Sequence, residues 1–199
     1  MIYPKALEEV IEYYKKLPGI GEKTAERLAL ASMEIDDDNT NKMLSNLRKI
    51  KDLKKCEICG HISEGDSCII CLDSDRNKNL ICVIEDYKSV FAFEKAGNFK
   101  GVYHVLGGLI SPIDDMTPDD INLKSLVKRT ESLENPELII ALKSTIEGET
   151  TTLYIKKIFE NKNVKISRLS YGIPIGADID YLDFMTLDRA LSDRKEISE

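Results

Sequence analysis

The chain has 199 residues, of which 42% are hydrophobic and 32% are charged, a composition typical of a soluble globular protein. No apolar run approaches the roughly 20 residues that a membrane-spanning helix requires, and the first residues lack the apolar segment of a signal peptide. We therefore expect a cytoplasmic protein with no membrane partner. The net charge of −7 argues at first against a nucleic-acid partner.

The charge is distributed unevenly along the chain. Residues 1–55 contain 11 lysines and arginines against 10 acidic residues, whereas residues 56–199 contain 17 against 25. Within the first part, residues 42–55 carry six basic side chains and only Asp52 as an acid. A polyanion binds to a local positive face and does not need a positive total, so this segment is a candidate for DNA contact. Taken alone, it is more simply a solvated helix face.

The apolar spacing predicts three helices before residue 55. The first covers residues 5–16 and ends at the Leu-Pro-Gly-Ile-Gly run of residues 17–21. The second carries apolar positions from Ala25 to Ser32. The third follows the acidic run 36–40, which offers N-cap side chains. It carries Met43, Leu47, Ile50 and Leu53.

The break between the first two helices resembles the helix-hairpin-helix motif of DNA-binding proteins. Gly19 and Gly21 can adopt backbone angles closed to other residues, and they allow a phosphate to approach closely. The second helix then begins with free N–H groups, and Lys23 and Arg27 lie four residues apart on one of its faces. None of these groups reads a base edge, so we expect binding that is independent of sequence. The alternative is an ordinary turn between two helices.

The cysteine segment has the spacing Cys56-x2-Cys59-x8-Cys68-x2-Cys71. Two Cys-x2-Cys turns can place four thiolates around one tetrahedral ion, which leaves no open coordination position. We therefore predict one structural zinc ion per chain, bound by these four side chains. The alternative is a set of unrelated reduced cysteines.

Three further side chains with reactive groups are expected to be structural. Cys82 lies inside an apolar run and is most simply a small core residue. His61 lies between the cysteine pairs and could replace a ligand, but four cysteines already suffice. His104 lies in a predicted strand, where a partly buried, hydrogen-bonded histidine is more common than a catalytic base.

From residue 80, apolar runs alternate with helical patterns, which predicts a largely parallel sheet with helices on its faces. A Gly- and Pro-rich loop at 170–182 and a short terminal helix follow. The predicted strands are 80–84, 102–106, 138–142 and 164–169, and the predicted helices are 87–96, one that starts at Thr117-Pro118-Asp119-Asp120, and 149–161.

Glu85 and Asp86 end the first strand of this sheet, at the edge where such sheets place their functional groups. This arrangement resembles the Toprim domain of topoisomerases and primases. Catalytic Toprim domains pair the first-strand glutamate with an Asp-x-Asp motif to hold Mg²⁺. Here the corresponding segment, residues 143–149, has no Asp-x-Asp and begins with Lys143, which would repel a cation. Glu85, Asp86 and Glu147 are therefore candidates for a weak Mg²⁺ site or a partner-binding site, with Glu149 nearby.

In their order, these motifs resemble one family along almost the whole chain, the bacterial recombination mediator protein RecR. The Tyr-His-Val-Leu-Gly-Gly run of residues 103–108 and the Gly-Ile-Pro-Ile-Gly run of 172–176, which follows Tyr171, are together highly specific. Lys143 departs from the family pattern, which usually has asparagine there. The departure puts metal binding near Glu147 in doubt.

The resemblance implies a non-catalytic DNA-binding protein of recombinational repair. Such proteins form ring-shaped homotetramers that are wide enough for duplex DNA and bind double- and single-stranded DNA. They act with RecO and RecF to promote RecA loading on single-stranded DNA. A nucleoid-associated location in the cytoplasm follows from this role.

The resemblance also implies an α+β multi-domain fold. We expect a helix-hairpin-helix domain at 1–55, a four-cysteine zinc finger at 56–72, a Toprim domain at 79–174 and a C-terminal subunit-contact segment at 175–199. Two other functions stay open. The first is a Mg²⁺-dependent Toprim nuclease or topoisomerase-like enzyme, and the second is a zinc-ribbon docking scaffold without DNA contact.

Overall fold

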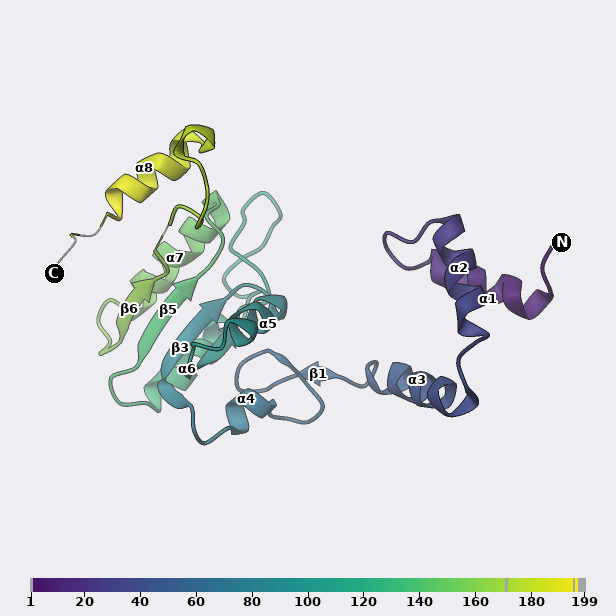
Figure 1. The fold of residues 1–199 in the computed structure, drawn as a ribbon. Coiled ribbons are helices and arrows are strands. Elements are labelled where there is room, and N and C mark those ends of the chain that lie inside the picture. The colour runs from purple at the N-terminus through teal and green to yellow at the C-terminus, as the bar shows by residue number, and fades with distance from the viewer. Residues whose placement is uncertain (1, 171, 195, 197–199) are drawn as a thin grey trace. The chain divides into compact units, whose positions relative to one another are not determined.

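The computed structural model describes residues 2–170, 172–194 and 196. The chain divides into two compact units, Met1–Leu53 and Lys54–Glu199 (Figure 1). Within the described residues, no helix combines the length and the apolar character needed to cross a membrane.

The N-terminal unit consists of the three predicted helices, α1 (Lys5–Lys15), α2 (Glu22–Ser32) and α3 (Asp37–Lys49). Ile11 of α1 packs with Ala25 and Ala29 of α2 to form a small buried core. The small alanine side chains let the two helices approach closely. The Asp36 carboxylate caps α3 by accepting a hydrogen bond from the backbone N–H of Asn39 at 2.9 Å.

The third helix is shorter than its apolar pattern predicted. Ile50 is its C-cap, and Leu53 lies outside it. The N–H groups of Lys51 and Asp52 bond to carbonyls three residues back, which closes the last turn tightly and ends the helix. Because no residue of α3 is buried within this chain, packing does not extend it further.

The second unit begins with the cysteine segment. β1 (Lys54–Lys55) pairs antiparallel with β2 (Ile62–Ser63), and a four-residue helix, α4 (Ile69–Leu72), follows. The paired strands belong to the second unit, so the chain passes from one unit to the other after Leu53.

A four-stranded sheet forms the centre of this unit, as predicted, and all its neighbouring strands are parallel (Figure 1). Every residue of β4 and the last four residues of β3 are buried, so both faces of the sheet are covered there. In the order of the sheet, the strands are β4 (Gly101–Val105), β3 (Asn77–Ile84), β5 (Glu137–Ala141) and β6 (Lys165–Arg168).

Three helices connect the strands, α5 (Tyr87–Ala96), α6 (Leu123–Glu131) and α7 (Ile146–Phe159). They bury Val90, Leu126 and Ile155 completely against the core of the sheet. The α5 boundaries agree with the prediction. α7 begins three residues before the predicted start, because the Thr145 hydroxyl accepts a hydrogen bond from the N–H of Gly148 and caps the helix.

The predicted helix start at Thr117 is wrong. The Asp120 carboxylate accepts hydrogen bonds from the N–H and the hydroxyl of Thr117, at 2.8 and 2.6 Å, and this closes a turn instead. The chain then returns to the sheet, where the N–H of Asn122 donates to the Leu106 carbonyl. Helix α6 starts only at Leu123. The sequence signal was local, and the long-range contact at Asn122 decided the boundary.

The C-terminal segment contains a short 3-10 helix (Ile179–Tyr181) and the predicted terminal helix, α8 (Phe184–Ser192). Asp183 caps α8 through the N–H of Thr186 at 2.9 Å. Several large apolar side chains of this segment are exposed, among them Ile175, Tyr181 and Phe184. Tyr171, which precedes the Gly-Ile-Pro-Ile-Gly run, lies outside the described residues, as do 195 and 197–199 of the expected subunit-contact segment.

Candidate DNA interface and metal centre

The hairpin between α1 and α2 depends on one glycine for its backbone shape. Gly19 has a φ of +81°, in the left-handed region that favours glycine. Gly21 has a φ of −88° and a ψ of 172°, an extended conformation that any residue adopts. The expectation of special backbone angles is therefore confirmed at Gly19 and wrong at Gly21.

Both glycines leave open space around the start of α2. A Cβ atom added to Gly19 or Gly21 would meet no atom within 4 Å. Gly21 is the N-cap of α2, and no side chain caps the helix. Among the described residues, no N-cap side chain accepts a hydrogen bond from the first N–H groups of α2, an arrangement that suits an anion.

Lys23 and Arg27 are both exposed on α2, one turn apart. The structure thus brings the two cations to the same helix whose N-terminus is open. Two acids lie on the same helix next to these cations, Glu22 and Glu26, and Glu22 pairs with Lys15 of α1 at 3.3 Å. The basic residues of α3, Lys42, Arg48 and Lys49, are exposed as well.

The four cysteine sulfurs lie within 4.8 Å of one another, and three of the cysteines are buried. The Sγ atoms of Cys59 and Cys68 are 3.6 Å apart. Sulfurs bound at about 2.3 Å to one tetrahedral ion lie roughly 3.8 Å apart, so the cluster fits a metal ion. Hydrogen bonding to the neighbouring thiols, together with burial, raises the pKa of the Cys59 thiol. A raised pKa means that deprotonating the thiol costs free energy, and a bound cation would offset this cost by stabilising the thiolates.

The first cysteine turn is closed by backbone contacts. The N–H of Gly60 donates to the Cys56 carbonyl at 2.8 Å, and the N–H of Cys56 donates to the His61 carbonyl at 2.7 Å. Gly60 has a φ of +76°, and a Cβ atom there would lie 2.8 Å from the Val105 carbonyl oxygen. Glycine is thus required at this position both by the backbone angle and by the space.

The cysteine segment is fixed to the sheet. The N–H of Val105, at the end of β4, donates to the Cys59 carbonyl at 2.7 Å. The buried cysteines belong to the same hydrophobic core as β3 and β4. His61 is buried with its ring edge-on to Phe91, 5.4 Å between centroids, and lies outside the group of metal-binding atoms. Cys82 is a core residue, as predicted.

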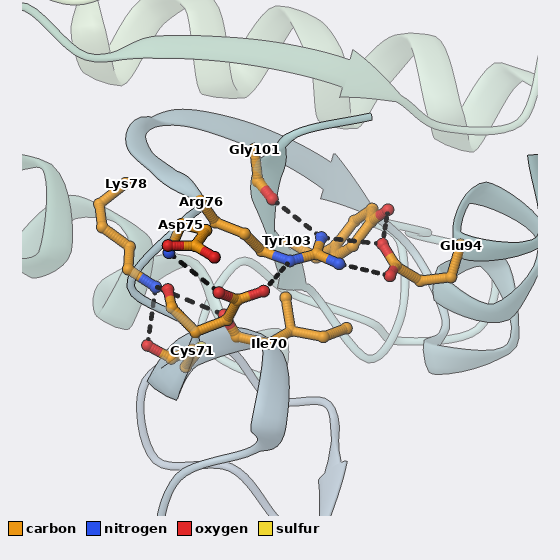
Figure 2. A network of polar contacts seen from close by, with 9 residues as sticks. Ile70, Cys71, Asp75, Arg76, Lys78, Glu94, Gly101 and Tyr103 are labelled. Carbon is orange, nitrogen blue, oxygen red and sulfur yellow. Dashed lines mark hydrogen bonds and ion pairs between the residues drawn. The ribbon is translucent and has the colours of Figure 1, made fainter. Parts of the chain in front are cut away.

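A network of polar side chains joins the end of α4 to the sheet (Figure 2). The Arg76 guanidinium donates to both carboxylate oxygens of Glu94 on α5, at 2.9 and 2.5 Å, and to the Gly101 carbonyl at 3.2 Å. Its Nε donates to Asp73 at 3.2 Å. The Tyr103 hydroxyl donates to Glu94 at 2.6 Å. Hydrogen bonds from Arg76 lower the pKa of the Glu94 carboxyl.

Sequence reasoning missed this network. Arg76, Glu94 and Tyr103 come from three separate parts of the fold, and no spacing motif relates them. One sequence feature could have pointed to the network: an arginine, Arg76, in the short link between the last cysteine and the first buried strand.

The acids at the carboxyl edge of the sheet do not converge. Glu85 pairs with Lys143 at 3.0 Å, and Asp86 caps α5 by accepting from the N–H of Lys88 at 2.7 Å. Glu147 accepts a hydrogen bond from its own backbone N–H at the start of α7, which lowers the pKa of its carboxyl. Glu149 lies 3.4 Å from both Arg168 and Arg189.

These residues do not fit the divalent cation that a Toprim fold implies. The Lys143 ammonium is hydrogen-bonded to one oxygen of the first-strand glutamate, Glu85, and thus places a cation where the metal would lie. The other oxygen of Glu85 is buried without a partner among the described residues, whereas Asp86 and Glu147 accept from backbone N–H groups. Among the residues that the structure describes, the four cysteines form the one group of three or more metal-binding side chains whose ligand atoms lie together.

Three segments of the chain match described families. Residues 7–51 match the family described as "RecR, helix-hairpin-helix", residues 79–170 match "Toprim domain", and residues 172–195 match "RecR, C-terminal". The chain is also 43% identical to the "Recombination protein RecR" of Staphylococcus aureus strains JH9 and Mu50, over 99% of this chain and all of those proteins. The protein of strain Newman is 42% identical over the same share.

This chain belongs to the RecR family. The identity covers the helical unit, the cysteine segment, the sheet and the C-terminal helix, so the order of motifs predicted for this family is confirmed along the chain. Membership implies a part in recombinational DNA repair.

Proposed function

We propose that this RecR-family chain is a non-catalytic recombination mediator that binds double- and single-stranded DNA without reading its sequence. One observation carries the proposal: the unobstructed glycine hairpin leads into an uncapped helix with exposed Lys23 and Arg27. A backbone phosphate at this helix start would accept hydrogen bonds from the free N–H groups, and the two cations would flank it. Gly19 and Gly21 would keep the approach clear.

The charge distribution supports the same interface. Residues 1–55 carry a slight excess of positive charge in a chain of net charge −7. Gathering several copies would concentrate this positive surface around DNA, and weak contacts in each copy would add up through avidity. We therefore include a ring-shaped homotetramer in the proposal. The exposed apolar side chains of α3 and of the C-terminal segment offer surface for contacts between copies.

The cysteine cluster is proposed to hold one structural zinc ion. A set of four thiolates favours zinc and leaves no position for substrate. The ion would stabilise the cysteine segment at the end of β4.

The carboxyl edge of the sheet is proposed to serve partners and not catalysis. Glu85, Asp86 and Glu147 would form part of the surface for RecO or RecF, which with this chain would promote RecA loading in the nucleoid of the cytoplasm. The Lys143–Glu85 pair argues against the alternative, a Mg²⁺-dependent Toprim nuclease or topoisomerase. Plasmid nicking with Mg²⁺ that Glu85→Gln abolished would favour that alternative.

The DNA interface is tested by the double variant Lys23→Ala, Arg27→Ala. We expect weaker binding to single- and double-stranded oligonucleotides, because fewer phosphate charges are neutralised. The slope of log affinity against log salt should flatten by about 0.9 for each duplex phosphate that is no longer neutralised. Fluorescence anisotropy at several salt concentrations measures both quantities.

The matched control is Lys156→Ala, Lys157→Ala, which removes two exposed cations from α7. It should bind as the unaltered protein does. Equal binding by the Lys23, Arg27 variant and the unaltered protein would contradict the proposed interface. Docking to partner proteins without any DNA contact would then be the better interpretation.

A further inference from the structure

We propose that Lys78 is a positioning residue for the metal centre, holding the second cysteine pair and offsetting the negative charge of the loaded site. The inference rests on the proposed metal binding and concerns a residue outside the ligand set. Lys78 lies near the start of β3, seven residues after Cys71.

The Lys78 ammonium is bound to the end of α4 (Figure 2). It donates to the carbonyl oxygens of Cys71 at 2.9 Å and Ile70 at 3.4 Å, and also to that of Asp73. An ammonium has three donors, and each has an acceptor here. The acceptors are carbonyls at a helix C-terminus, where a cation is favourable. Lys78 thus bonds to the backbone of a predicted metal ligand.

The charge of the site gives this contact a second effect. Four thiolates around a divalent ion leave a net charge of minus two. The cysteines are largely buried, and a buried charge needs a nearby opposite charge or hydrogen bonds. Backbone N–H groups donate to three of the sulfurs: that of Cys68 lies 3.3 Å from the Cys56 Sγ, and those of His61 and Cys71 donate to Cys59 and Cys68. These donors are dipoles and leave the net charge of the loaded site unchanged. The ammonium of Lys78 adds a full positive charge 2.9 Å from the carbonyl oxygen of Cys71, on the backbone of this predicted ligand.

The Arg76 network keeps this contact in place. Asp73 offers its carbonyl to Lys78 and its carboxylate to Arg76. Arg76 is in turn held by both carboxylate oxygens of Glu94, and only 16% of its side chain is exposed. The link between the last cysteine and β3 is therefore held in place at Asp73 and Arg76. A ligand held this way needs little ordering when the metal binds.

The test compares Lys78→Met with the unaltered full-length protein. Co²⁺ is titrated by its thiolate absorption bands, and Zn²⁺ is measured by competition with Co²⁺. We expect Lys78→Met to bind both ions roughly 10- to 100-fold more weakly, as for other residues that support metal ligands. Lys78→Arg, which keeps the charge and the donors, should recover most of the loss, and Lys78→Gln should fall between them.

The control is Lys165→Met, which removes a lysine paired to Glu137 at 3.0 Å on a different pair of strands. It should leave metal affinity unchanged. A second measurement separates positioning from general stability. If Lys78 acts on the metal, Lys78→Met lowers the melting temperature more in the zinc-loaded protein than in the chelated protein.

The outcomes distinguish the two proposals. If the unaltered protein binds neither ion, the metal centre and the role of Lys78 both fail. If it binds both ions and Lys78→Met binds them equally well, only the role of Lys78 is overturned. Equal losses of melting temperature with and without zinc would likewise overturn it.

Discussion

The imidazole of His104 is completely buried in β4. Its Nε2 lies 2.7 Å from the Asn122 carbonyl oxygen and therefore donates to it, which leaves Nδ1 without a partner. The prediction of a hydrogen-bonded histidine is confirmed for one nitrogen, and the burial is greater than expected. Burial lowers the pKa of His104 to about 4, so the ring is neutral at physiological pH.

This burial makes the stability depend on pH. As the pH falls from about 6.5, the unfolded imidazole gains a proton that the folded ring gains only near pH 4. The folded state should lose roughly 3 kcal/mol across this window. His104→Gln keeps a donor for Asn122 and should remove this loss, although its stability at pH 7 will be lower. Urea unfolding between pH 7.5 and 4 measures the difference, and parallel pH profiles for the two proteins would contradict the prediction.

At the scale of the element, α3 is a helix without a buried face. Its four apolar side chains, those of Met43, Leu44, Leu47 and the C-cap Ile50, are 45–57% exposed. The same helix carries the basic residues proposed to face DNA. An apolar stripe at helical spacing beside a charged face is typical of a helix that packs against another chain.

We expect Leu44→Gln, Leu47→Gln to reduce the native mass, because the proposed contact between copies loses apolar area. Native mass spectrometry at several protein concentrations, with and without DNA, measures this. Circular dichroism should show the helices retained, since neither leucine is buried in the chain. Leu153→Gln, at an exposed leucine of α7, is the control. An unchanged mass in the double variant would exclude α3 from the contact.

At the scale of the whole molecule, the metal centre belongs to the core of the second unit. The buried cysteines pack in the same cluster as the strands of the sheet, whereas Ile11, Ala25 and Ala29 form a separate core in the first unit. Metal binding should therefore stabilise one unit and not the other.

Removing the metal tests this separation. Chelation of the full-length protein should increase amide exchange in the cysteine segment and at the ends of β3 and β4. Exchange in α1 and α2 should stay unchanged, because their core does not include the cysteines. Hydrogen exchange with mass spectrometry resolves the segments, and readding Zn²⁺ should restore protection. An equal increase of amide exchange in both units after chelation would show that they unfold together.

The long apolar runs and helical periods predicted most of the elements to within a few residues. Such patterns work because burial of one face or both faces of an element repeats at its own period. The predictions failed where a single contact from elsewhere decided the outcome. The capping pattern at Thr117 did not start a helix, because the backbone hydrogen bond from Asn122 to Leu106 holds the chain against the sheet before α6 begins. Helix α3 ended earlier than predicted, because the N–H groups of Lys51 and Asp52 bond to carbonyls three residues back.

Spacing along the chain was enough to predict the parallel sheet, the cysteine set and the helices other than the start of α6. The sequence by itself also determined the glycine hairpin with its two cations. The tertiary structure alone decided which charges meet. Glu85 and Lys143 are 58 residues apart, and Arg76 and Glu94 are 18 apart, yet each pair is in contact. Ion pairs of this kind depend on the register of packed elements, and no local pattern specifies that register.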